Sequence, residues 1–377
     1  MSASIEPGDA VDPAGMATYA WEPTTDFLAR KYGLAREAIV RFDVNTSPTP
    51  PDLRDVLTGV FDPSLSEYPP SDYATLVDAA AAAYGVGTDE LLPTAGADEA
   101  LDLIARASLR EWSVAVAAVP TYAMYGIVTE QRGASFVGVP RLPREEGFGL
   151  DIPALAEAAL TAQMVWLCEP NNPTATVEPP ERIAEFLDQL TADAAGDDRE
   201  APVVAVDEAY VEFTGRSVLP LRERYPRLVV VRTLSKAHAL AGMRVGFAVA
   251  RPETLGPILS YRAPASVSTV SAALATAALR RPELAAANVA RIAEQRARLI
   301  SELSAIGWRP YPSQVNFVLF RFTSPEVAAA AAEALLRRGL VPRTFGLDHT
   351  LADCLRLTVR SAQENDRLIN AAREIPA

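Results

Sequence analysis

The sequence predicts an α/β protein in which a mainly parallel sheet of the seven-stranded type lies between helices, with a smaller α+β domain at the C-terminal end. Three observations predict this. Short, continuously apolar runs recur along the first 264 residues, stretches with helical periodicity lie between several of them, and the pattern changes after Pro264. A strand that is apolar at every position is buried on both faces, which is typical of a parallel sheet covered by helices.

The individual elements follow from the periodicity and from the residues that end it. Helices are expected at 18–34, 73–85, 97–110, 180–192, 283–307, 325–338 and at the C-terminus. Strands are expected at 114–119, 135–140, 164–168, 202–207, 228–232 and 245–250, and in the smaller domain at 316–322 and 355–359. Gly85 and Gly307 stand where a glycine commonly ends a helix.

We expect the chain to divide into four segments. Residues 1–17 are rich in small, acidic and Pro residues and are predicted to be a mobile lead-in. Residues 18–50 are predicted to form an arm that packs with the small domain. Residues 51–264 are predicted to form the large domain, which carries the functional site, and residues 265–377 the small domain.

Composition and charge exclude several classes of protein. The chain has 35 basic and 48 acidic residues, a formal net charge of −13, so its surface repels phosphate backbones and no nucleic-acid partner is expected. The acidic N-terminus is unlike a signal peptide and no apolar run reaches membrane-spanning length, so no membrane partner is expected. Two cysteines, Cys168 and Cys354, are too few for a disulfide framework and favour a reducing, cytoplasmic location.

Lysine and histidine are both rare. Lysine occurs only at Lys31 and Lys236, and histidine only at His238 and His349. Chemistry that needs a primary amine therefore has two side chains available. Hydrolysis by a Ser-His-Asp triad is poorly supported, and no metal site is expected.

The segment TLSKAHALAGMRVGF at 233–247 directly follows the apolar run 228–232. Lys236 in this segment can form an imine with a phosphorylated aldehyde cofactor. The hydroxyl of Ser235 and the guanidinium of Arg244 can bind the phosphate oxygens of such a cofactor. The alternative is a surface lysine beside the start of a helix.

Two further segments place polar side chains at the ends of predicted strands. In VVAVDEAYVEF (203–213), Asp207 ends a buried type of strand, where a carboxylate needs a partner such as a protonated pyridine nitrogen. Tyr210 in the same segment, and Asn172 in CEPNNPTATV (168–177), can reach a phenolate oxygen on that ring. Alternatively, Asp207 caps a helix or lies in a turn, and the Asn-Pro pair forms a turn.

Two segments can supply groups for the phosphate and for the ring. TAGADEALDL (94–103) places Gly96, Ala97 and Asp98 at a helix entrance, where backbone N–H groups and the helix dipole bind phosphate. Tyr122, in VPTYAMYG (119–126), follows a predicted strand, where its ring can stack on a flat heterocycle. The alternatives are an ordinary capped helix and a core aromatic.

Two arginines near the C-terminal end are candidates to bind an anionic substrate. Arg356 lies between two leucines in CLRLTVR (354–360), so by alternation it either pairs with an acid or binds an anion. Arg343 is a second anion contact or a solvated surface charge.

In this order the motifs resemble those of the aspartate-aminotransferase superfamily of fold type I pyridoxal-phosphate enzymes, and within it the histidinol-phosphate aminotransferases. The similarity runs from about Thr18 to the C-terminus through the segments ADEA, PTYxMY, PNNPT, VDEAY, TLSKA…AGxRxG and LRxTV. It implies pyridoxal 5′-phosphate as the cofactor, with Lys236 as the imine-forming and proton-transferring lysine. The residues implied to hold the cofactor are Asp207, Tyr210, Asn172, Tyr122, Ser235 and Arg244, with Gly96, Ala97 and Asp98 at its phosphate.

The resemblance also implies contacts with the substrate and with a second subunit. Tyr68 resembles the tyrosine that reaches the cofactor phosphate of the neighbouring subunit, which implies a homodimer. Tyr19, Arg343 and Arg356 resemble residues that contact the anionic group of the substrate.

Several positions depart from the family pattern. Ala20–Glu22 replaces a usual Pro-Gly, and Asn45–Pro48 replaces NENP. Ala175 and Arg360 stand where glycines are expected, and His238 where an aromatic or apolar residue is common. None of these departures touches the imine chemistry, and those near the substrate side bear on the choice of substrate.

The implied reaction is a transamination between an amino donor and a 2-oxo acid, expected to be 2-oxoglutarate. Lys236 moves a proton from the substrate Cα to the cofactor C4′, and Asp207 keeps the ring nitrogen protonated. L-histidinol phosphate, an intermediate of histidine biosynthesis, is the expected donor. The alternatives are an aromatic or other amino-acid aminotransferase, a lyase similar to threonine-phosphate decarboxylase, and a non-catalytic protein that binds the cofactor.

Overall fold

The chain forms two compact units in the computed structural model, which describes residues 22–56, 64–196 and 199–375. Unit 1 takes in the chain up to Asn45, Pro173–Ala175 and Ile292–Ala377. Unit 2 takes in Thr46–Asn172 and Thr176–Arg291.

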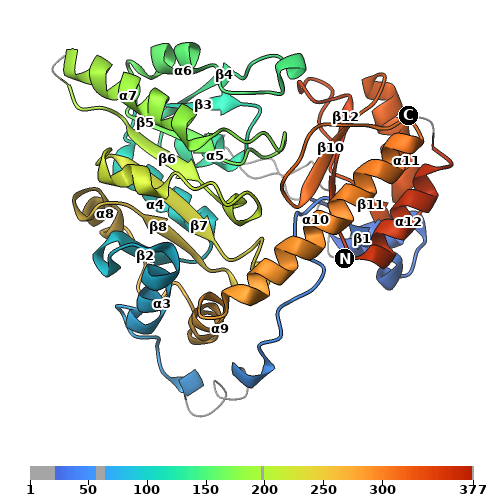
Figure 1. Cartoon of the computed structure of the whole chain (residues 1–377), viewed down its shortest axis with the longest axis horizontal. Coiled ribbons are helices and arrows are strands. Elements are labelled where there is room, and N and C mark those ends of the chain that lie inside the picture. The colour runs from blue at the N-terminus through green and yellow to red at the C-terminus, as the bar shows by residue number, and fades with distance from the viewer. Residues whose placement is uncertain (1–21, 57–63, 197–198, 376–377) are drawn as a thin grey trace, which may run out of the picture. The chain divides into compact units, whose positions relative to one another are not determined.

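Unit 2 is built on a seven-stranded sheet with the strand order β2-β8-β7-β6-β5-β3-β4 (Figure 1). Its strands are β2 (Leu91–Thr94), β3 (Val114–Val119), β4 (Ser135–Pro140), β5 (Met164–Cys168), β6 (Val203–Asp207), β7 (Leu228–Thr233) and β8 (Gly246–Val249). Neighbouring strands are parallel, except that β8 is antiparallel to both β2 and β7. The predicted α/β fold class with a mainly parallel seven-stranded sheet is confirmed.

Helices cover both faces of this sheet (Figure 1). The helices that share a hydrophobic core with one face are α3 (Ala74–Tyr84), α6 (Ile152–Ala159), α7 (Pro180–Gly196) and α9 (Thr269–Leu279). Those on the other face are α4 (Ala97–Ser108), α5 (Met124–Glu130) and α8 (Pro252–Leu259). In β3, Val116 packs into the first core, whereas Ala115 and Ala117 pack into the second. Burial of alternate residues on opposite faces explains why the strands are apolar throughout.

Unit 1 combines small sheets with helices. Its strands are β1 (Val40–Arg41), β9 (Arg309–Pro310), β10 (Phe317–Arg321), β11 (Leu340–Val341) and β12 (Cys354–Thr358). β12, β10 and β9 form an antiparallel sheet in that order, and β1 pairs with β11 in parallel. Its helices are α1 (Thr25–Tyr32), α11 (Pro325–Leu336) and α12 (Ala362–Ala372). The buried ring of Trp308 packs edge-on against Phe320 and Phe322, with ring centroids 5.7 Å and 4.8 Å away.

Short 3-10 turns join the main elements. They are η1 (Arg36–Ala38), η2 (Ser64–Ser66), η3 (Thr88–Glu90), η4 (Arg144–Glu146), η5 (Val211–Phe213), η6 (Leu219–Glu223) and η7 (Ala241–Met243). Among the described helices, none is both long and apolar enough to cross a lipid bilayer.

The division between the units falls inside α10 (Pro282–Ala305), between Arg291 and Ile292. The preceding helix α9 packs against α3 and therefore belongs to unit 2. The sequence analysis instead drew the boundary after residue 264, where the residue pattern changes. Contacts and residue pattern are different criteria for dividing a chain, so the four predicted segments stay predictions. Residues 1–17 lie outside the described part of the chain.

Candidate active site

The predicted cofactor residues of unit 2 follow three neighbouring parallel strands. Asn172 follows β5, Asp207 is the last residue of β6, and Ser235 and Lys236 follow β7. The register pairs Cys168 of β5 with Asp207. Because parallel strands end at the same edge of a sheet, these side chains are brought to one edge, where α/β enzymes bind ligands.

Asp207 is a buried carboxylate held by two neutral donors. The hydroxyl of Tyr125 donates to Oδ2 at 3.0 Å, and the backbone N–H of Ala209 donates to Oδ1 at 3.0 Å. Burial raises the pKa of Asp207 to about 6, and the bonds from Tyr125 and Ala209 oppose that rise. The bond from the backbone N–H of Ala209, two residues further on, is the contact expected of an aspartate in a turn. It leaves lone pairs of the carboxylate available to a further donor.

Lys236 lies close enough to act on this carboxylate electrostatically. Its ammonium charge lowers the pKa of Asp207, while the nearby carboxylate of Asp98 raises it. The Nζ atom of Lys236 lies 5.6 Å from the centre of the Tyr210 ring. The amine therefore lies near both the buried acid and Tyr210.

The entrance to α4 is a cradle made of backbone. Gly96 has φ +85°, and a Cβ atom placed on it would lie 2.4 Å from Nη2 of Arg244. A Cβ atom on Gly246 would lie 2.6 Å from the carbonyl carbon of Gly96 and 2.8 Å from the backbone nitrogen of Ala97. Only glycine fits at either position, which lets β8 and the guanidinium of Arg244 approach the helix N-terminus.

Side chains beside this cradle are joined by hydrogen bonds. Asp98 accepts from the hydroxyl of Tyr122 at Oδ1, 3.0 Å, and pairs with Nη2 of Arg244 at Oδ2, 3.1 Å. The hydroxyl of Thr233 donates to Oγ of Ser235 at 2.9 Å and holds it at the end of β7. An anion bound at α4 would therefore meet N–H groups, a guanidinium and a hydroxyl.

Two residues of the site were missed by the sequence analysis. Tyr125 was not predicted, because a tyrosine on a helix is commonly part of the hydrophobic core. Its fully buried ring stacks on Trp166, with centroids 5.5 Å apart and planes 8° apart. Cys168 has its Sγ 3.4 Å from the backbone nitrogen of Asn172, which donates to it. Burial raises the pKa of the Cys168 thiol to about 12, so it stays protonated.

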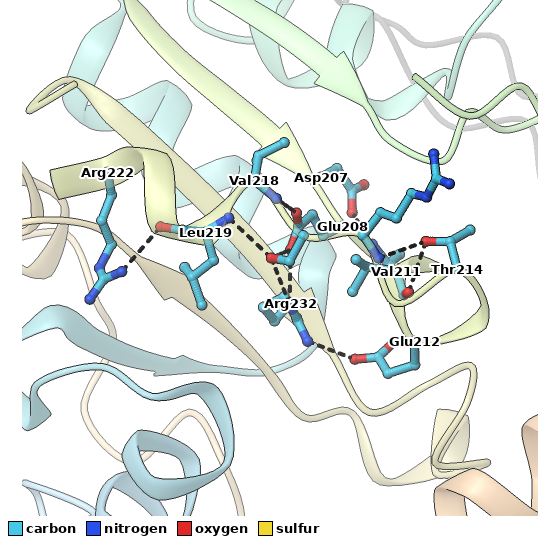
Figure 2. Close-up of polar contacts among 12 residues, drawn as sticks. Asp207, Glu208, Val211, Glu212, Thr214, Val218, Leu219, Arg222 and Arg232 are labelled. Carbon is cyan, nitrogen blue, oxygen red and sulfur yellow. Dashed lines mark hydrogen bonds and ion pairs between the residues drawn. The ribbon is translucent and has the colours of Figure 1, made fainter. Parts of the chain in front are cut away.

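A cluster of charged and polar side chains lies next to Asp207 in the chain, just after β6 and on β7. We call it the Arg232 cluster, and it consists of Arg232, Glu208, Glu212 and Ser217. Figure 2 shows Arg232 of β7 reaching both Glu208, at 2.8 Å, and Glu212, at 3.1 Å. Glu208 also accepts from Ser217 and from a backbone N–H, at 2.8 Å and 2.6 Å. The cluster therefore ties the chain after β6 to β7.

The predicted substrate arginines lie opposite each other in unit 1. Arg343 and Arg356 form a two-way backbone bridge, each N–H donating to the other's carbonyl at 3.0 Å. The guanidinium of Arg356 is buried, lies 5.3 Å from the centre of the Phe317 ring and donates to the backbone oxygen of Asp43. Arg343 forms an ion pair with Glu22. The third predicted substrate contact, Tyr19, lies outside the described residues.

The predicted subunit contact Tyr68 lies on the surface of the chain. Its side chain is 89% exposed. It borders a hollow of about 430 Å³ that is also lined by Leu65, Pro264 and Ala265.

The structure describes the surroundings of three residues that depart from the family pattern. Ala175, at a position where the family has glycine, has φ +62° and is buried, so the backbone there adopts a conformation that suits glycine. Arg360 pairs with Glu364 at 2.8 Å in the first turn of α12. His238 is buried, and burial lowers the pKa of its imidazole, so it is neutral.

The site suits a flat, phosphorylated aldehyde whose ring carries a basic nitrogen. A buried acid supplies the partner for the nitrogen, an amine supplies the attachment point, and a glycine-lined helix entrance supplies the phosphate cradle. Each feature is an observation on this chain, and together they fit pyridoxal 5′-phosphate.

Known proteins resemble this chain in sequence and in fold. Residues 41–371 match the family model described as aminotransferase class I and II. The chain is 34% identical, over 100% of both sequences, to the histidinol-phosphate aminotransferase of Roseiflexus castenholzii. It is 38% identical to that of Xanthomonas campestris pv. campestris, over 82% of this chain and 85% of the relative. The structure of histidinol-phosphate aminotransferase from Sinorhizobium meliloti in complex with pyridoxal-5′-phosphate superposes with a TM-score of 0.84, at 25% identity, covering 94% of each chain.

Proposed function

The chain belongs to the class I and II aminotransferases, and on that premise we propose that it transfers the amino group of L-histidinol phosphate to 2-oxoglutarate. It is a pyridoxal-phosphate-dependent transaminase. The choice of donor is supported by the relatives named histidinol-phosphate aminotransferase at 34% and 38% identity. An aromatic or other amino-acid aminotransferase and a lyase similar to threonine-phosphate decarboxylase are the alternatives.

One observation carries the assignment of the chemistry. The buried carboxylate of Asp207 is held by neutral donors, and the charge of Lys236 lowers its pKa. A buried carboxylate that is not neutralised by a cation lowers the stability of a protein, so the presence of Asp207 at this position points to a cationic ligand. A protonated ring nitrogen is such a ligand.

The residues of the chain have distinct roles in the reaction. Pyridoxal phosphate supplies, when bound, an aldehyde that takes up amines and a ring that accepts electrons. Lys236 would hold the cofactor through its Nζ atom and, when free, would take the proton from the donor Cα. Asp207 would keep a proton on the ring nitrogen, and Tyr210 and Asn172 would donate to the ring oxygen.

The phosphate end is assigned to the α4 cradle. Its ligands are the N–H groups of Ala97 and Asp98, Ser235 and Arg244, and the ring of Tyr122 would stack on the cofactor. Arg244 is paired with the half-exposed Asp98, an ion pair that a dianionic phosphate would compete for. The substrate anion is assigned to Arg343 and Arg356, with Tyr19 as a further contact.

We also propose a cytoplasmic homodimer that acts in histidine biosynthesis. The side chain of Tyr68 is 89% exposed, so little of its surface packs against its own chain. Such an exposed aromatic side chain supports a role for Tyr68 across a subunit interface. The oligomeric state can be measured by light scattering. In a dimer, mixing Tyr68→Phe with Lys236→Ala subunits would leave hybrid sites with distinct activities.

The decisive test of the function is a half-reaction screen with Lys236→Ala as the control. Wild-type enzyme loaded with pyridoxal phosphate should lose its long-wavelength absorbance with histidinol phosphate and keep it with phenylalanine, tyrosine or threonine phosphate. Borohydride should attach the cofactor to Lys236 in the wild type. Turnover by Lys236→Ala, or a faster response to phenylalanine, would overturn the chemistry or the donor respectively, and release of carbon dioxide would indicate the lyase.

A further inference from the structure

Tyr125 places a hydroxyl within hydrogen-bonding distance of Asp207. It lies on α5, its ring is fully buried, and its Oη donates to Oδ2 of Asp207 at 3.0 Å. A neutral hydroxyl that donates to a buried carboxylate stabilises the charged form of the acid. None of the motif residues assigned above makes this bond.

The Tyr125 ring is held on two sides, so the direction of its hydroxyl is set by packing. Trp166 stacks on one face, and its Nε1 donates to the hydroxyl of Thr129 at 3.1 Å. Tyr122 packs edge-on, with centroids 5.8 Å apart and planes 88° apart. Tyr125 therefore contacts both the predicted acid and the residue predicted to stack on the cofactor ring.

Each oxygen of Asp207 accepts a hydrogen bond from the described part of the chain. Oδ2 accepts from Tyr125 and Oδ1 accepts from the backbone N–H of Ala209. A carboxylate has about four acceptor positions, so a further donor can be accepted while the group stays in place. If the Tyr125 bond were lost, burial alone would favour the protonated acid, which is a poor partner for a cation.

From this geometry we infer that Tyr125 is a positioning residue, which holds Asp207 as the charged acceptor for a protonated aromatic ring nitrogen. The inference rests on the proposed function, because it concerns the same acid and the same class of ligand. It adds a residue that acts through Asp207 rather than on the substrate.

The chain offers a matched control in Tyr84. Its hydroxyl is also buried but makes no hydrogen bond among the described residues, and its ring packs edge-on against Phe247 at 5.7 Å. Tyr84→Phe and Tyr125→Phe each remove one buried hydroxyl oxygen. Only the second removes a bond to Asp207.

The test is the pH dependence of pyridoxal-phosphate binding to the cofactor-free full-length chain, followed by absorbance between pH 5 and 9. Titrations of the cofactor and of Lys236 are common to all variants, so differences report on Asp207. Tyr125→Phe should move the acid limb of binding upward by about one pH unit and weaken binding about tenfold at pH 7. Tyr84→Phe should follow the wild type.

A double variant tests whether the effect passes through Asp207. In an Asp207→Asn background, Tyr125→Phe should cause no further shift, because the titrating group is absent. Incorporation of 3-fluorotyrosine at position 125 should move the limb downward, since the hydroxyl becomes a stronger donor, and this holds even if Tyr125→Phe folds poorly.

Three results would overturn the inference. They are an unmoved acid limb in Tyr125→Phe, an equal shift in Tyr84→Phe, or an undiminished shift in the Asp207→Asn background. Failure of the cofactor chemistry in the proposed function is distinguishable, because borohydride would then leave Lys236 of the wild type unlabelled, and failure of the donor assignment appears only in the half-reaction screen. Labelled Lys236 with an unmoved limb would reject only the role of Tyr125.

Discussion

Asp207 and Glu208 are neighbours in the chain, yet the structure treats their carboxylates in opposite ways. Glu208 is ion-paired with Arg232 at 2.8 Å and accepts from Ser217 and from the backbone N–H of Val218 (Figure 2). Asp207 has two neutral donors. Both are buried, so both have lost the hydration that stabilises a charge.

On the proposed function, the difference separates a structural acid from a ligand-binding acid. Glu208 has a cation from the protein itself and connects β6 with β7. Asp207 would keep its cationic partner position for the cofactor. Consecutive side chains at a strand end point to opposite sides, so one residue can serve each purpose without mixing the two.

The largest effect that would sharpen this comparison is on catalysis. Asp207→Asn should lower kcat/KM by about 10²–10³-fold or more, because it removes a charge that acts in the transition state. Glu208→Gln, one residue away, should lower kcat/KM less than about tenfold while reducing thermal stability. Steady-state rates with histidinol phosphate at saturating cofactor measure both, and equal losses in the two variants would contradict the division.

The next effect is on stability, and it should fall on the structural side. Arg232→Met leaves Glu208 buried without its cation and should lower the free energy of unfolding by about 3–5 kcal/mol. Arg222→Met is a suitable control, since Arg222 donates to both oxygens of Glu90 at 2.9 Å, and Glu90 is the more exposed acid. A smaller loss is expected there.

Urea unfolding of the cofactor-free proteins measures both losses. Adding Glu208→Gln to Arg232→Met should restore part of the stability, because the unpaired charge is removed. A double variant that is less stable than Arg232→Met would contradict the ion-pair explanation.

The third effect is the pH dependence of the cofactor-free protein. The pKa of Asp207 is raised from 3.8 to about 6, so the folded state binds the proton more tightly than the unfolded state. Its contribution to stability is complete below pH 3.8 and is lost as the pH rises through about 6. That loss corresponds to about 3 kcal/mol.

Asp207→Asn should therefore make the cofactor-free protein more stable than the wild type at pH 8, with the difference disappearing towards pH 4. Pyridoxal phosphate should reverse the order at pH 8, because only the wild type gains the ring-nitrogen contact. Thermal unfolding at both pH values, with and without cofactor, measures this. A wild type that is the more stable at pH 8 without cofactor would show that the protein already satisfies Asp207.

The sequence predicted local features well and distant pairings poorly. β3, β4 and β5 have the predicted bounds because each is a continuous apolar run between breaks. β2 was not predicted, since its four residues include Pro93 and give no period. Gly85 ends α3 in the left-handed region as expected, with φ +67°.

The same limit applies to the site. Lys236, Asp207 and Asn172 were predicted because each follows a recognisable strand. Tyr125 and Arg232 were missed, since their partners lie 82 and 24 residues away in the chain. Such pairings follow from strand order and helix packing, which no local pattern encodes.

The smallest expected effect concerns the backbone beside the site. Ala175 has φ +62°, where a Cβ atom costs about 1 kcal/mol, so Ala175→Gly should raise the free energy of unfolding by up to about that amount. Ala156, buried within α6, is the control, because Ala156→Gly should lower it by about 1 kcal/mol.

The Ala175 result decides whether the site carries backbone strain in addition to an unneutralised acid. A gain in stability with unchanged kcat would mean that the strain is incidental to the reaction. A gain in stability with a lower kcat would mean that the loop after Asn172 holds its conformation for catalysis, as Asp207 holds its charge. A loss of stability as large as that of Ala156→Gly would contradict the strain, because the control loses the same methyl group and gains the same freedom in the unfolded state but has no positive φ.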